Sequence, residues 1–473
     1  MPLQRRIPIS FRPMPLEALL AAVPESPISI EVILVLSTHS KPLGYTGIGL
    51  LLLTIFKSLG MSQGSPTARM AVGLCLLLLA VVALLILFRE GYEKNQLFSL
   101  LLPIALALFL RSLLLDHATL DYQDFLSRWV AHFRDNGGFS ALKDPVGNYN
   151  VPYLYMLAFL SYLPIPDLYG IKLFSILFDF LLAWGGLRLT KVLTRSKAAP
   201  LWAFSILLLL PTVVLNGSCW GQCDSVWAAL CVWALSFALE ERPIFSLTFL
   251  ALAFSFKLQA IFILPLWGAF WFTRRVRFRQ LFVFPGIFFL STLPALLAGK
   301  PMGDILQVYL NQAGDSVSWK TVNYNSPSVF ALLPYHSESA PWVPKLAITL
   351  AFLFTLGILV LLFLRRKKVD NYALALAGTA MSLGIPFLLP YMHERYFFLG
   401  GVLLVIISCA HPALAPGAAG AELASLGGYH AYLMKRYVIV LTLFGITWTQ
   451  LVEGLLMLGA IGFTLAALRR QTT

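Results

Sequence analysis

The chain has 473 residues, of which 58% are hydrophobic and only 12% are charged, and its mean hydropathy is +0.78. This composition excludes an ordinary soluble globular protein, in which about a quarter of the residues are charged. The net charge of +13 is typical of basic connections between membrane helices. We therefore expect the lipid bilayer as a partner and no nucleic acid.

Apolar runs recur along most of the chain and predict a polytopic membrane protein. Before them, residues 1–40 carry several arginines and prolines, which predict a poorly structured cytoplasmic lead-in without a cleavable signal peptide. The expected spans are 43–59, 70–88, 96–115, 169–190, 200–216, 220–240, 243–256, 258–273, 279–299, 343–364, 370–390, 396–411 and 437–467.

Two apolar stretches are ambiguous. Residues 151–164 are too short for a full crossing and predict a half-span or a helix at the membrane interface. Residues 437–467 are long enough for a hairpin, with a break expected near Gln450 and Glu453. The sequence thus predicts an all-α fold, a transmembrane helical bundle of about 12–14 helices.

The distribution of lysine and arginine predicts the orientation. The basic connections, expected in the cytoplasm, are 274–279, 365–368, 191–197 and 469–470. Alternating spans then place 116–168, the turn at 216–224, 300–342 and the triplet at 393–395 together on the opposite face. This alternation requires that 151–164 does not cross and that 437–467 crosses twice.

The first loop on that face carries two candidate catalytic carboxylates, Asp121 and Asp124. Phe125, Trp129 and Phe133 recur every fourth residue and predict an amphipathic helix on the membrane surface. Carboxylates at its start would be favoured by the helix dipole alone. The alternative is that one of them points into a cavity and takes a proton from a hydroxyl group.

Aromatic side chains follow in the same loop. Asn148, Tyr149 and Tyr153 lie in a run suited to wall a pocket and to stack on a sugar face, with Trp129 nearby.

Three further polar clusters flank apolar segments on the same predicted face. In the turn at 216–224, Trp220, Gln222 and Asp224 offer hydrogen-bonding groups, although Asp224 could simply cap a helix. Lys257 lies between two apolar runs and is either a snorkelling lysine or a ligand for phosphate.

The fourth cluster is the triplet His393, Glu394 and Arg395, placed where one apolar run ends and the next begins. Ionisable groups beside hydrocarbon are costly to desolvate and indicate a functional site. The guanidinium fork suits phosphate oxygens, with His393 as a hydrogen-bond donor or proton shuttle. A structural salt bridge between Glu394 and Arg395 is the alternative.

These motifs, in this order, resemble those of the GT-C glycosyltransferases, membrane enzymes that use polyprenyl-phosphate sugars. The likeness is to bacterial mannosyltransferases related to the enzyme that adds the second mannose of GPI anchors, which themselves resemble the dolichyl-phosphate-glucose-dependent glucosyltransferases. It covers about residues 100–411 and rests on Asp121, Phe125-Leu126, Trp129, Gly137-Gly138, Asn148-Tyr149-Asn150-Val151-Pro152-Tyr153, Trp220-Gly-Gln-Cys-Asp224-Ser225, Ala253-Phe-Ser-Phe-Lys257-Leu-Gln259 and Met392-His-Glu-Arg-Tyr-Phe397.

The resemblance implies a GT-C-like catalytic module at 96–411. The apolar pattern adds a cytoplasmic lead-in with additional transmembrane helices in 1–95, which the resemblance does not cover, and a transmembrane hairpin in 412–473. The resemblance also implies that Asp121 is the catalytic base, that Asp124 is secondary and that the triplet serves the donor phosphate. The expected reaction is inverting transfer of a hexose to a hydroxyl group of a glycan, lipid or protein, on the extracytoplasmic face of a bacterial inner membrane. A transporter or flippase of lipid-linked sugars is the alternative.

The sequence does not demand a cofactor. Cys219 and Cys223 form a close pair, but no histidine lies near enough in the sequence to complete a zinc set, so we expect no metal site there. Some GT-C relatives use a divalent cation, which leaves that requirement open.

Overall fold

The computed structural model describes residues 40–318, 322–333, 341–443 and 445–472, so the expected lead-in lies outside the described residues. Among the described residues, eight helices are long and apolar enough to cross a membrane, or nine if one bent pair counts as a single span. Four shorter helices of 10–17 residues are also apolar. The predicted all-α polytopic bundle is confirmed.

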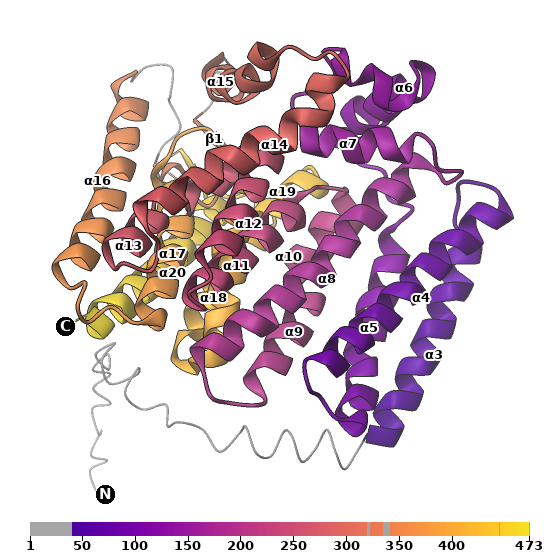
Figure 1. Cartoon of the computed structure of the whole chain (residues 1–473), viewed down its shortest axis with the longest axis horizontal. Coiled ribbons are helices and arrows are strands. Elements are labelled where there is room, and N and C mark those ends of the chain that lie inside the picture. Colours follow the sequence, from indigo (N-terminus) through magenta and orange to yellow (C-terminus); the bar gives the residue numbers. More distant parts are fainter. Residues whose placement is uncertain (1–39, 319–321, 334–340, 444, 473) are drawn as a thin grey trace, which may run out of the picture.

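The first three helices of the described residues form one side of the bundle in Figure 1 and are attached to it at the end where they meet α8. Asp116 accepts hydrogen bonds from Tyr169 Oη (2.7 Å) and Lys57 Nζ (3.3 Å). Ser65 caps the second helix, because its side chain accepts a hydrogen bond from the Ala68 amide. The helices are α3 (Ser40–Leu59), α4 (Pro66–Arg89) and α5 (Lys94–Leu114).

The first loop folds into short helices across one end of the bundle. The expected amphipathic helix is present, and its own side chains Val130 and Phe133 are buried. The next helix begins where Asn150 accepts from the Val151 amide, and its ten residues reach about 15 Å, half a membrane crossing. These elements are η1 (Tyr122–Leu126), α6 (Ser127–Asp135), η2 (Gly138–Lys143) and α7 (Val151–Leu160).

The centre of the bundle breaks within the turn predicted at 216–224, and the expected span 220–240 is a continuous helix that begins at Asp224. A π-helix ends at Trp220, Gly221 turns the chain with φ +78°, and the following helix begins only at Asp224. Pro211 bends the preceding pair by 43°. The elements are α8 (Asp167–Leu193), α9 (Ala199–Leu209), α10 (Pro211–Val214), η3 (Leu215–Trp220), α11 (Asp224–Leu239) and α12 (Pro243–Phe256).

The expected span 258–273 is also interrupted. A 3-10 turn covers its first residues, and a helix of only seven residues begins after Pro265. The elements from here to the triplet and beyond are η4 (Leu258–Phe262), α13 (Leu266–Phe272), η5 (Phe278–Phe282), α14 (Val283–Leu297), α15 (Met302–Ser318), β1 (Asn323–Tyr324), η6 (Val329–Leu332), α16 (Trp342–Leu364), α17 (Asn371–Leu388), β2 (Met392–His393) and α18 (Phe398–Ala410).

The prediction for 437–467 was wrong. One helix runs through Gln450 and Glu453 without a break, and its antiparallel neighbour is a helix that the hydropathy pattern did not predict. That neighbour is rich in glycine and alanine, which allow close helix packing in membranes without high apolarity. The elements are η8 (Pro412–Leu414), α19 (Ala415–Leu433), β3 (Thr442–Leu443), β4 (Ile446–Thr447) and α20 (Trp448–Thr472).

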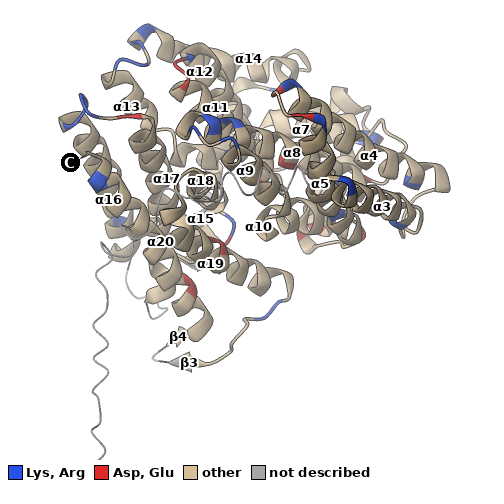
Figure 2. Ribbon diagram, turned by 90° about the horizontal axis from the view of Figure 1, so that it is seen from below, with Lys and Arg blue, Asp and Glu red and all other residues tan. Residues whose placement is uncertain are grey.

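The bundle has a basic end opposite the first loop. There Lys191 Nζ lies 2.7 Å from Glu90 and Arg188 3.0 Å from Glu240, while Arg274 and Arg366 line one polar cavity. Figure 2 shows Lys and Arg on the connection between α13 and α14 and on the end of α16. Asp121 and Asp224 lie at the other end, which we call the site end, since α8 and α11 begin there and run to the basic end.

Candidate functional site

Asp121 is held by three hydrogen bonds from two distant parts of the chain. Its Oδ2 accepts from Trp220 Nε1 (2.9 Å) and Gln222 Nε2 (2.6 Å), and its Oδ1 accepts from Tyr432 Oη (2.8 Å). It makes no side-chain capping bond to the helix that follows, so the capping alternative does not describe it. A carboxylate offers about four acceptor positions, and the three donors therefore leave one lone pair on Oδ1.

Two π-helical segments present these groups. Asp121 directly precedes η1, and Trp220 is the last residue of η3, after which Gly221 in the left-handed region turns the chain toward Gln222. Wider π turns are rare and occur mainly at functional sites. Ser175 supports this turn from α8, since its Oγ donates to the Gln222 carbonyl (2.7 Å).

The Trp220 indole joins the carboxylate to the triplet. Tyr432 stacks on its ring at 4.1 Å between centroids, and the guanidinium carbon of Arg395 lies 5.2 Å from the same ring's centroid. Asp121 and Arg395, 274 positions apart in the sequence, thus contact one buried side chain. The proximity that the sequence predicted is present in the fold.

Asp224 is the buried counter-charge of the site. Its carboxylate lies 2.5 Å from Lys257 Nζ and 3.8 Å from Arg395 Nε, and it accepts from Asn216 Nδ2 (2.8 Å). Lys257 is only 6% exposed, which excludes a snorkelling lysine. Cys223, and not Asp224, is the residue that precedes α11, and it makes no side-chain cap. Neither simple alternative describes these residues.

The triplet is fixed by a two-residue parallel strand pair. Met392 and His393 pair with Asn323 and Tyr324, and the His393 ring stacks on Tyr324 at 4.6 Å. Glu394 is 1% exposed and accepts from Arg395 Nη1 at 3.1 Å, so the salt bridge considered from the sequence exists. Among the described residues, Arg395 Nε has no hydrogen-bond partner, although it is buried.

Burial shifts both ionisable neighbours of Arg395. It raises the pKa of Glu394 to about 7, an effect that Arg395 opposes and the charge of Asp121 reinforces. Burial, followed by the charges of Arg395 and Lys257, lowers the pKa of His393 to about 3. His393 is therefore a neutral hydrogen-bonding group near pH 7, and Arg395 carries the positive charge.

The aromatic run of the first loop lines the same cluster. Tyr149 packs on Tyr153 with centroids 4.7 Å apart and on Trp129 at 5.9 Å. The Tyr149 ring lies 5.8 Å from Lys257 Nζ, and its hydroxyl donates to Gln222 (3.5 Å). Asn148 is exposed and contributes its carbonyl to Gln312, so its side chain is at the rim.

Asp124 does not join the cluster. It is exposed and pairs with Arg128 at 3.6 Å one turn later. This contact is a surface pair of small energetic value, and the structure separates the two carboxylates that the sequence grouped.

The sequence did not reveal the contribution of α19. Tyr429 and Tyr432 lie on one side of this helix, where Tyr429 Oη accepts from Asn216 and Tyr432 bonds Asp121. Their spacing of three residues was the available signal, because it places both on one helical face. Without a predicted helix at 415–433, that spacing had no meaning.

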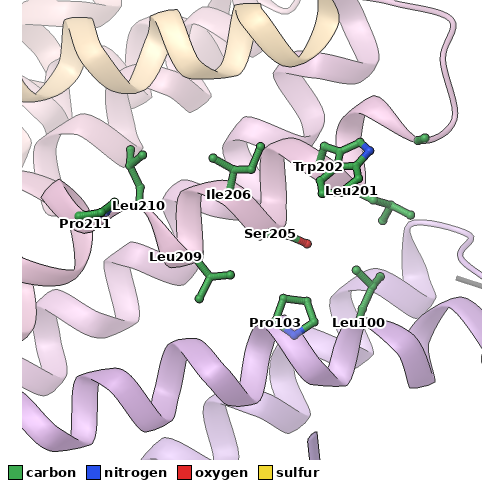
Figure 3. Close-up of a pocket in the computed structure, with 10 residues that line it drawn as sticks. Leu100, Pro103, Leu201, Trp202, Ser205, Ile206, Leu209, Leu210 and Pro211 are labelled. Carbon is green, nitrogen blue, oxygen red and sulfur yellow. The ribbon is translucent and has the colours of Figure 1, made fainter. Parts of the chain in front are cut away.

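An apolar groove lies away from this cluster, between α5 and α9 (Figure 3). Leu100 and Pro103 of α5 face Trp202, Ile206 and Leu209 of α9 across it. Apart from Ser205 the lining is apolar, so the groove offers little for polar chemistry.

Among the described residues, no group of three or more His, Cys, Asp and Glu side chains is placed to hold a metal ion.

Comparisons with known proteins define the class. A search of curated proteins found no match. Residues 148–390 match the model of glycosyltransferase family 87. The match includes Trp220, Asp224 and Lys257, whereas Asp121 precedes it and the triplet follows it. Apolar helices that span a membrane and a buried polar cluster at one end fit this assignment. The chain belongs to glycosyltransferase family 87 and is a membrane glycosyltransferase.

Proposed function

We propose that the protein transfers a hexose from a polyprenyl-phosphate sugar to a hydroxyl acceptor, with inversion at the anomeric carbon. One observation carries the proposal: Asp121 and Arg395 contact the same Trp220 indole. A base and an anion-binding group are thereby held beside one another, as displacement at a sugar carbon requires.

Asp121 is the proposed base. The three donors orient its carboxylate and leave one lone pair of Oδ1 for the acceptor hydroxyl. The acceptor oxygen bonds to the anomeric carbon, its proton passes to Asp121, and the bond from that carbon to the phosphate oxygen breaks. A single displacement of this kind inverts the configuration.

Arg395 is the proposed ligand of the departing phosphate. The unpartnered Nε and the planar fork suit phosphate oxygens. Lys257 supports it less directly, because Asp224 already neutralises the lysine at 2.5 Å. Charge that grows on the phosphate as the bond breaks is stabilised by these fixed donors, and a phosphate leaves as an anion without an acid.

The proposed donor is inferred from the motif resemblance and from the position of the site at one end of a bundle of membrane helices. Tyr149, Tyr153 and Trp129 supply ring surfaces for a sugar. The resemblance to the mannosyltransferases and glucosyltransferases supports a hexose. We place the site on the extracytoplasmic face, because the basic connections at the opposite end favour the cytoplasm. A bacterial inner membrane fits this orientation.

The test is sugar transfer by the purified protein in nanodiscs, offered polyprenyl-phosphate mannose, glucose, galactose or arabinose with glycan and lipid acceptors. Asp121→Asn should lower the rate by about 10²–10⁴-fold, the usual contribution of a general base. Asp124→Asn is the matched control, and its rate should stay within about threefold of wild type, because Asp124 is exposed and forms a surface ion pair with Arg128.

Equal losses in the two variants would contradict the role of Asp121. In sealed proteoliposomes, movement of the lipid-linked sugar across the bilayer without transfer in either form would instead support a transporter. Repeating the assay with a chelator and added divalent cations determines whether a metal is needed.

A further inference from the structure

The segment between α19 and the β3–β4 hairpin exposes a run of large apolar side chains. In Figure 2 this connection extends away from the helices and carries Lys or Arg at its start. Soluble surfaces rarely expose contiguous apolar groups of this size. The exposed fractions are between 47% and 73% for Met434, Val438, Ile439, Val440 and Leu441. We call residues 434–441 the 434–441 segment.

Hydrogen bonds fix the depth of this segment along α20. The backbone of Ile439 bonds Thr449 Oγ1 through both its amide and its carbonyl (2.9 and 2.8 Å), and the Trp448 amide donates to the Leu441 carbonyl (2.8 Å). The segment therefore lies level with the first turn of α20.

That level is a membrane boundary. From Trp448 to Leu468, α20 rises about 30 Å, which equals the thickness of the hydrocarbon core. Arg469 and Arg470 follow at its far end. Trp448, which is partly exposed, is the residue type that prefers the interface between hydrocarbon and head groups.

The apolar surface is continuous with the lipid-facing side of α20. Val452, Leu455 and Leu458 are exposed along that helix and have lipid as their solvent in a spanning helix. The 434–441 segment extends this surface beyond the first turn of α20.

Two exposed cations stand at the start of the segment. Lys435, with φ +55°, and Arg436 follow the last turn of α19. Lys435 Nζ lies 4.0 Å from the centroid of the Tyr432 ring, and Tyr432 donates to Asp121. Cations at this depth attract lipid phosphates.

We propose that the 434–441 segment is an interfacial anchor that inserts its apolar side chains into the bilayer and binds anionic head groups through Lys435 and Arg436. The occupant of this surface is the bilayer itself. The anchor begins two residues after Tyr432, and the contacts from Lys435 to Tyr432 and from Tyr432 to Asp121 connect it to the carboxylate of the site. This inference does not depend on the proposed reaction.

The test uses Val440→Cys in a Cys75→Ser background, labelled with an environment-sensitive fluorophore, in nanodiscs. The label should be quenched by phospholipid that carries a nitroxide near the top of its acyl chain and should be shielded from aqueous iodide. Lys367→Cys, exposed at the basic end, is the control and should be quenched by iodide. Quenching of position 440 by iodide alone would overturn the proposal.

The cations are tested with the same label. Its emission should shift further to the blue in phosphatidylglycerol than in phosphatidylcholine. Lys435→Ala with Arg436→Ala should remove that difference, whereas Arg365→Ala with Lys367→Ala should keep it. Identical emission in both lipids would overturn the head-group contact. Shielding that arises only when polyprenyl phosphate is added, or only at protein concentrations that form dimers, would overturn the bilayer as the occupant.

Discussion

The chemistry of the site depends on how two cations are shared among the carboxyl groups of Asp121, Asp224 and Glu394. Arg395 contacts Glu394 and lies near Asp224, and Lys257 is paired with Asp224. When Glu394 is ionised, the cluster carries an excess negative charge that opposes an incoming phosphate. When Glu394 is protonated, Arg395 is released to bind that phosphate. If the donor is the proposed polyprenyl-phosphate sugar, the protonation of Glu394 is thus linked to its binding.

This linkage predicts the pH dependence. Burial raises the pKa of Glu394 to about 7, so the group is neutral below that pH and charged above it. The KM for the donor should rise as pH increases from about 6 to about 8, and the rise should be absent in Glu394→Gln. Initial rates at several donor concentrations across this range measure it. A wild-type KM that falls with pH, or an equal rise in the variant, would contradict the linkage.

The residues of the site were predictable where a motif named them, and not where a helix was missed. Trp220, Gln222 and Asp121 were each singled out, and they contact one another directly. Asp124 was grouped with them because sequence spacing does not say which carboxylate leaves the surface. Tyr432 was overlooked because nothing local indicates that a tyrosine 311 positions away reaches Asp121.

At the scale of elements, α19 closes the site by close backbone approach. A Cβ added at Gly428 would lie 2.7 Å from the Asn325 carbonyl oxygen and 2.8 Å from Glu394 Cβ. The first neighbour is backbone of the segment that follows β1, which holds the triplet. Hydropathy patterns detect long apolar helices such as α4 and α16 well, but a helix of small residues that packs this closely does not stand out.

Gly428→Ala should therefore disturb the triplet. The added methyl group must displace α19 or the segment after β1, and we expect at least a tenfold loss of transfer together with a lower thermal midpoint in detergent. Gly459→Ala on α20 is the matched control, since nothing lies within 4 Å of its added Cβ. Activity of Gly428→Ala equal to that of Gly459→Ala would show that this approach is not required.

At the scale of the whole molecule, the bundle separates a basic end from the end that holds the site. This separation could be predicted from lysine and arginine even though two spans were drawn wrongly, because the charges lie in connections and not in helices. The break at Gly221 lies in the turn that was predicted at 216–224. The break at Pro265 could not be placed in advance, since periodicity alone does not distinguish one buried helix from two short ones.

The orientation predicts labelling from one side only. Ser140 is exposed in the first loop, and Lys367 is exposed at the basic end. In a Cys75→Ser background, Ser140→Cys should react with a membrane-impermeant maleimide in intact cells, and Lys367→Cys should react only after permeabilisation. The reverse pattern would place the site in the cytoplasm.

The most direct test of the shared site is donor binding measured separately from transfer, with a radiolabelled polyprenyl-phosphate hexose and protein in nanodiscs. Asp121→Asn should bind the donor within about threefold of wild type yet transfer poorly. Arg395→Lys keeps the charge opposite Asp224 but loses the planar fork, and it should bind the donor about tenfold more weakly, a difference of about 1.4 kcal/mol. Unchanged donor binding in Arg395→Lys, or loss of binding in Asp121→Asn with transfer retained in Arg395→Lys, would contradict the assignment of base and phosphate ligand.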